Sequence, residues 1–118
     1  MPASLLSKPR DLAALFMLLV IAWNTAEFAL QPVRRPPSDE ILVLCLTLFI
    51  LIFLPYVRSG GRWAVLGALV AVATHWVLAI AGLWIAGAND GFGKYGPAVA
   101  LLLLTVALYG AFRAWRSA

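Results

Sequence analysis

Four long apolar runs, separated by short polar segments, dominate the pattern along the chain. The runs cover residues 11–30, 41–57, 63–88 and 95–112. An α-helix needs about 20 mainly apolar residues to cross the hydrocarbon core of a bilayer. The connecting segments are rich in proline, glycine and charge, which typically end helices. The pattern therefore predicts an all-α fold, a single domain formed by an integral membrane bundle of four transmembrane helices.

Composition excludes a soluble fold. Hydrophobic residues make up 64% of the 118 residues, charged residues 12%, and the mean hydropathy is +0.94. Soluble domains are about half apolar and about a quarter charged. The first run is longer than the core of a typical signal peptide, and no small-residue cleavage site follows it, so we expect it to remain as a span.

Basic residues flank the runs and predict the orientation. One side carries six of them: Lys8, Arg10, Arg58, Arg62, Arg113 and Arg116. The other side carries three: Arg34, Arg35 and Lys94. The positive-inside rule then places both termini in the cytoplasm. We expect a multi-pass protein of the cell (inner) membrane whose net charge of +4 serves the lipid bilayer rather than nucleic acid.

Small residues indicate where helices approach each other closely, because lipid removes the hydrophobic drive for helix association. The third run is rich in such residues at four-residue spacing, whereas the second run contains only bulkier side chains. We therefore expect the third helix at the centre of the bundle and the second at its lipid-facing edge. The predicted packing residues are Gly67, Ala71, Gly82 and Ala86, with a further seam formed by Ala107, Gly110, Ala111 and Ala114 on the fourth helix.

Polar groups inside the spans are the candidates for function, because each is costly in lipid unless it has a partner or a cavity. Glu27 lies near the outer end of the first span, Asn24 one turn before it, and His75 near the middle of the third. A carboxyl group and an imidazole can exchange protons near neutral pH. Two structural alternatives stay open: Glu27 pairs with Arg34 or Arg35 at the outer interface, and His75 only donates an interhelical hydrogen bond.

Several chemistries are not supported. With one cysteine, Cys45, and one histidine, the chain offers no set of zinc or copper ligands, and we predict no metal site. A Ser–His–Asp arrangement has no suitable serine near His75. We therefore expect no enzymatic activity.

Helix association is the function that the small-residue pattern favours. We expect an accessory or scaffolding subunit that contacts other membrane protein subunits or further copies of itself. The alternative is a small oligomeric transporter or proton-coupled exporter that uses Glu27 and His75. A lesser alternative is a haem- or chlorophyll-binding subunit with His75 as the ligand, although the sequence specifies no cofactor.

Overall fold

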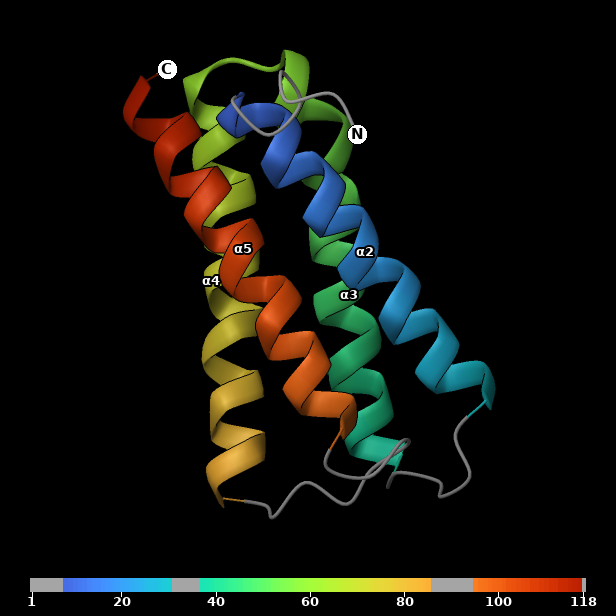
Figure 1. Cartoon of the computed structure of the whole chain (residues 1–118). Helices are drawn as coiled ribbons and strands as arrows, with labels where there is room; N and C mark the ends of the chain where they lie inside the picture. Colours follow the sequence, from blue (N-terminus) through green and yellow to red (C-terminus); the bar gives the residue numbers. More distant parts are fainter. Residues whose placement is uncertain (1–7, 31–36, 86–94, 118) are drawn as a thin grey trace.

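The computed structural model describes residues 8–30, 37–85 and 95–117, which form four α-helices (Figure 1). They are α2 (Pro9–Leu30), α3 (Pro37–Ser59), α4 (Arg62–Ile85) and α5 (Tyr95–Ser117). The described residues contain no strand. Each helix includes a segment long and apolar enough to cross a membrane. The predicted all-α architecture with four such helices is confirmed.

The helices extend past the apolar runs into their polar flanks. α3 begins at Pro37 rather than at residue 41, and α5 continues to Ser117 rather than ending at residue 112. Proline is well tolerated in the first turn of a helix, where its missing N–H would have no intrahelical acceptor. Basic side chains in the last turn, such as Arg116 in α5, interact favourably with the helix dipole. Residues 86–88 of the third predicted span lie outside the described residues.

Successive helices run in opposite directions and form a ring of four neighbours (Figure 1). α2 packs against α3 and α5, α4 packs against the same two helices, and the diagonal pairs touch only weakly. We call the end formed by Pro9, Ser59, Arg62 and Ser117 the basic end, because the six basic residues of the predicted cytoplasmic side lie in or beside these helix ends.

A tight turn joins α3 to α4 at the basic end. The Gly60 amide donates to the Tyr56 carbonyl over 2.6 Å. A Cβ at Gly60 would lie only 2.5 Å from that same carbonyl oxygen, so the turn requires glycine. Arg10 Nη1 donates to the Gly60 carbonyl over 2.8 Å and approaches those of Val57 and Arg58. Arg10 of α2 thus satisfies carbonyls that the end of α3 leaves without intrahelical partners.

The core-facing positions repeat every three and four residues. On α2 they are Ala13, Met17, Val20, Asn24 and Glu27, and on α5 they are Ala100, Leu104, Ala107, Ala111 and Ala114. α3 and α4 follow the same spacing with Leu46, Ile50 and Val57, and with Val65, Ala68, Val72 and His75. A 3.5-residue repeat keeps one seam of each helix turned toward its neighbours and is typical of left-handed bundles.

The expectation of a central third helix is wrong, because a ring of four helices has no central member. α4 contacts two neighbours, as every other helix does. Within its membrane-spanning segment, α5 buries the largest share of residues and α3 the smallest. The predicted seam on α5 is confirmed: Ala107, Gly110, Ala111 and Ala114 are all buried. Alanine and glycine at these positions let α5 lie close to α2.

Candidate functional site

Three polar side chains of the spans are buried within the bundle, and all occupy core-facing positions. Asn24 is 7% exposed, Glu27 3% and His75 5%. Asn24 and Glu27 continue the seam of α2 that begins with Ala13, while His75 continues the seam of α4. We call these three residues the interior polar cluster; Asn24 and Glu27 lie on α2 and His75 on α4, which are diagonal helices of the ring. Their burial places them away from lipid, where a polar group is most costly.

Asn24 links two neighbouring helices. Its side-chain Nδ2 donates to Thr47 Oγ1 of α3 over 2.9 Å, and Thr47 Oγ1 donates to the Val43 carbonyl over 2.8 Å. Sequence reasoning did not identify Thr47 as a partner. The available signal was its position as the single threonine or serine within the second run.

Two interhelical hydrogen bonds lie at one level, deep within the length of the bundle. A second bond joins α4 to α5, where Trp76 Nε1 donates to Thr105 Oγ1 over 2.9 Å. With a rise of about 1.5 Å per residue, these groups lie about 18–22 Å from the basic end. This polar layer consists of Asn24, Thr47, His75 and Thr105. Glu27 lies about one turn farther from the basic end along α2.

His75 differs from the other members of the layer. Its Nδ1 atom is buried and is the one buried side-chain nitrogen or oxygen without a hydrogen-bond partner among the described residues. A buried polar atom left unsatisfied costs about 1–3 kcal/mol. Such an atom in a native core typically marks a bound water molecule or a group that exchanges a proton or ligand.

An apolar layer separates the interior polar cluster from the basic end. One fully buried residue from each helix forms it: Met17, Ile50, Val72 and Ala107. With a rise of about 1.5 Å per residue, these residues lie about 12–15 Å from the basic end. They lie one turn or less from the polar layer on α3, α4 and α5, and about two turns from it on α2. We call them the apolar plug. At the level of the plug, the core formed by the described residues contains only apolar side chains.

The predicted packing residues fall into different surroundings. Ala71 is 1% exposed and belongs to the core. A Cβ at Gly67 would overlap the ring of Phe53 on α3, so this glycine accommodates an aromatic side chain rather than a helix backbone. Gly82 lies in α4, and Ala86 lies outside the described residues. The described residues contain no group of three or more His, Cys, Asp or Glu side chains suited to a metal ion.

The Asn24–Thr47 bond predicts a measurable coupling between α2 and α3. In a cycle of Asn24→Ala, Thr47→Ala and the double variant, we expect a coupling energy of about 0.6 kcal/mol, the average for interhelical hydrogen bonds in a membrane protein. Reversible unfolding in mixed micelles measures it. The matched control is a second cycle that combines Asn24→Ala with Thr74→Ala. The Thr74 hydroxyl donates to Val70 of its own helix, so this cycle should show no coupling. Additive Asn24 and Thr47 effects would contradict the prediction.

Comparison with known proteins adds no functional assignment to this geometry. No protein family matches the chain, and neither the curated proteins nor the solved structures give a significant match.

Proposed function

We propose that this chain is a multi-pass inner-membrane protein that moves protons, or a substrate coupled to protons, with Glu27 and His75 as the titrating groups. The observation that supports the proposal is the burial of both side chains in the core of an apolar bundle, at 3% and 5% exposure. Ionisable groups inside membrane bundles are rare and typically belong to proton relays or substrate paths.

The burial of the small residues weakens the argument for a subunit that acts only through association. That hypothesis rested on small residues free to contact another helix. Ala68, Ala71, Ala107, Ala111 and Ala114 are instead at most 1% exposed, so they pack helices of the same chain. The small residues on these seams therefore explain the fold of one copy and leave the interior polar cluster unexplained.

The apolar plug implies how such a protein would work. Met17, Ile50, Val72 and Ala107 separate the cluster from the basic end, so a proton that reaches Glu27 or His75 cannot continue through polar side chains of the core. Movement across the membrane then requires a second conformation in which the plug opens. A conformational equilibrium of this kind is the usual basis of coupled transport.

The experiment is a proton-flux measurement on the purified protein in lipid vesicles. A pH-sensitive dye inside the vesicles follows the decay of an imposed pH gradient, with empty vesicles as the baseline. Faster decay with the protein, or decay that a supplied substrate accelerates, supports the proposal. Rates equal to the baseline across candidate cationic, anionic and neutral substrates would refute it.

The proposed orientation has its own test. With the basic end in the cytoplasm, a reporter enzyme that is active only in the periplasm should work when fused after Pro36 and be inactive after Gly60 or Ala118. The physical reason is the excess of basic residues, six against three, on the cytoplasmic side. Cell fractionation and immunoblotting confirm that each fusion is present. Activity of the fusion after Ala118 would contradict the proposed topology.

Self-association is a second candidate function, and one observation favours it. The outer face of α2 carries small residues at helical spacing: Ala22, Thr25 and Ala29 are all exposed. The Thr25 hydroxyl donates to Ile21 of its own helix, so it needs no further partner. This face allows close approach of a second helix, from another copy or from a different subunit.

Leucine at these positions tests the association. Ala22→Leu and Ala29→Leu should weaken an oligomer by forcing helix backbones apart, and Leu48→Ala on the exposed face of α3 is the control. Analytical ultracentrifugation in detergent measures the change, which we expect to be at least about tenfold in the dissociation constant. An unchanged oligomer in both variants would exclude this face.

Ligation of a haem or chlorophyll-type pigment by His75 stays a lesser proposal. The unpartnered Nδ1 atom is the observation in its favour, since imidazole is a common axial ligand. The visible absorption spectrum of the protein purified from its native membranes tests it, and a spectrum without pigment bands would end it.

A further inference from the structure

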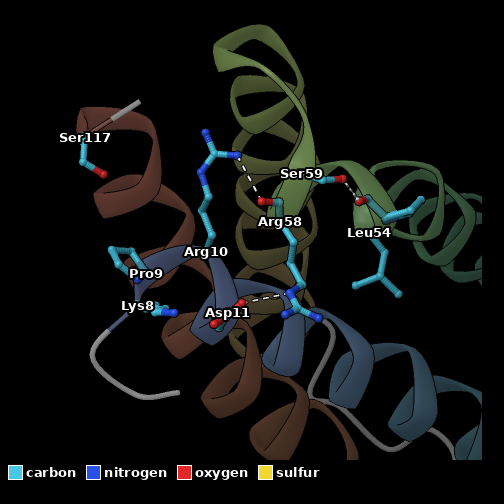
Figure 2. Close-up of a pocket in the computed structure, with 9 residues that line it drawn as sticks. Lys8, Pro9, Arg10, Asp11, Leu54, Arg58, Ser59 and Ser117 are labelled. Carbon is cyan, nitrogen blue, oxygen red and sulfur yellow. Dashed lines mark hydrogen bonds and ion pairs between the residues drawn. The ribbon is translucent and has the colours of Figure 1, made fainter. Parts of the chain in front are cut away.

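A cleft of about 720 Å³ opens at the basic end of the bundle (Figure 2). The residues that line it come from the start of α2, the last turns of α3 and the end of α5. Three of them are basic, Lys8, Arg10 and Arg58, and one is acidic, Asp11. Leu54 and Pro55 supply an apolar wall. The cleft therefore combines a net positive charge with an apolar side.

The acidic residue of the cleft is already neutralised. Arg58 Nε lies 2.8 Å from Asp11 Oδ1, and the Asp11 side chain is only 15% exposed (Figure 2). The Arg58 side chain is 63% exposed, and its two terminal nitrogens have no acceptor among the described residues. The ion pair thus engages Nε, and the donors of both terminal nitrogens of this cleft-lining side chain stay available. A fixed planar guanidinium is well suited to bind phosphate through two hydrogen bonds.

Backbone dipoles at the cleft favour an anion as well. The first turn of α2 lies in its wall. Pro9 has no N–H group and the Leu12 N–H donates to the Lys8 carbonyl, so the N–H groups of Arg10 and Asp11 are those without intrahelical acceptors. The end of α3 would have the opposite effect, but Arg10 covers its carbonyl groups. Lys8 is exposed, and its side chain makes no hydrogen bond or ion pair to the described residues. Its ammonium group is therefore available to a ligand.

The other basic residues of this end are engaged differently. Arg62 lies over the ring of Trp115 at 5.2 Å, Arg113 over Tyr109 at 5.7 Å, and Arg116 over Phe112 at 5.9 Å. None of these three arginines lines the cleft. The positive-inside rule requires only an excess of basic residues at this end and does not require that they line a cleft. The convergence of Lys8, Arg10 and Arg58 on one cleft is a separate feature.

The depth of the cleft identifies the source of the anion. It lies where the membrane-spanning helices begin and end, which is the level of lipid headgroups. Exposed apolar side chains continue from it along α2 and α3, including Leu18, Leu48 and Leu51. Acyl chains attached to a bound headgroup would lie against this surface.

We infer that the cleft between the start of α2 and the ends of α3 and α5 binds the phosphate group of an anionic phospholipid. Arg58 and Lys8 contact the phosphate, Asp11 holds Arg58 in place, and Leu54 and Pro55 contact the beginning of an acyl chain. The site is independent of proton movement by the interior polar cluster, from which the apolar plug separates it.

Lipid binding by the purified protein tests the site. Native mass spectrometry counts lipids retained from micelles that contain phosphatidylglycerol, phosphatidylcholine, or phosphatidylcholine with inorganic phosphate. We expect retention of phosphatidylglycerol, and a loss in apparent affinity of about fivefold for each basic residue removed in K8Q/R58Q. The matched control is R113Q/R116Q, which removes the same charge from the same end outside the cleft and should bind as the unaltered protein does.

Three results would overturn the inference. Equal losses in the two double variants would indicate a diffuse charge effect rather than a site. Equal retention of phosphatidylcholine would remove the role of the anionic headgroup. Full competition by inorganic phosphate at the lipid's concentration would assign the cleft to free phosphate. Should the loss of the Arg58–Asp11 pair unfold the double variant, Lys8→Gln alone decides, since the Lys8 side chain makes no contact that the fold requires among the described residues.

Discussion

Glu27→Gln is expected to reduce protein-dependent proton flux in vesicles by about a hundredfold or more, the effect typical of losing a positioned proton-transfer group. The substitution keeps the size of the side chain and its capacity to form hydrogen bonds, but the amide does not titrate. Because Glu27 is 3% exposed and lies on the core-facing seam of α2, the bundle should accommodate the isosteric amide. The loss would then report the missing proton site rather than unfolding.

His75→Gln should reduce flux to a similar extent for the same reason, since the amide cannot carry a proton at neutral pH. If one path uses both residues, the double variant should be no worse than either single variant. Thr25→Val and Thr74→Val are the controls. They neighbour the two sites in sequence, but their hydroxyls donate to carbonyls of their own helices.

Circular dichroism and size-exclusion chromatography establish that each variant is folded. Full flux in a folded Glu27→Gln or His75→Gln protein would mean that the buried group is structural. Equal losses in the threonine controls would mean that flux depends on general packing of α2 and α4. Either outcome would remove these two residues from the proposed mechanism.

The number of helices and their alternating direction were predictable, because the thickness of a bilayer sets how many apolar residues a span needs. The inward face was predicted on α5, from its small residues, but could not be predicted in the same way for every helix. In a soluble bundle the polar face identifies the opposite, buried face. Here Leu48 faces outward and Ile50 inward on the same helix, although both are aliphatic. Apart from the small residues, the polar residues Asn24, Glu27 and His75 mark the core in the sequence, because lipid contact would be costly for them.

Close packing was predicted on both α4 and α5, but the helix with the closest backbone approach was not identified. Counting small residues favoured α4, but Gly67 of α4 faces the Phe53 side chain. Gly110 of α5 instead lies directly against the backbone of α2 at Ala13 and Pro9. The two glycines differ in what they face on the neighbouring helix. The number of small residues on one helix does not show whether a glycine faces a movable aromatic side chain or a backbone.

Gly110→Ala is therefore expected to destabilise the bundle by about 1–3 kcal/mol, the range for an added methyl group in a tightly packed core. The new Cβ would lie 2.9 Å from the Ala13 nitrogen, 3.2 Å from its Cα and 3.3 Å from the Pro9 carbonyl oxygen. All three atoms belong to the backbone of α2, so no side chain can rotate away. The helices α2 and α5 would have to separate along their whole contact.

The sign of the effect makes this prediction a sharp one. Without a clash, replacing glycine by alanine inside a helix stabilises it by about 1 kcal/mol through helix propensity. Gly61→Ala, in the turn just before α4, is the control for an added methyl group that meets nothing, because no atom lies within 4 Å of a Cβ at that position. It should leave the free energy of unfolding within about 0.5 kcal/mol of the unaltered protein. Reversible unfolding in mixed micelles measures both variants. A more stable Gly110→Ala protein would show that α2 and α5 are not in backbone contact, and the packing of the whole bundle would need to be redrawn.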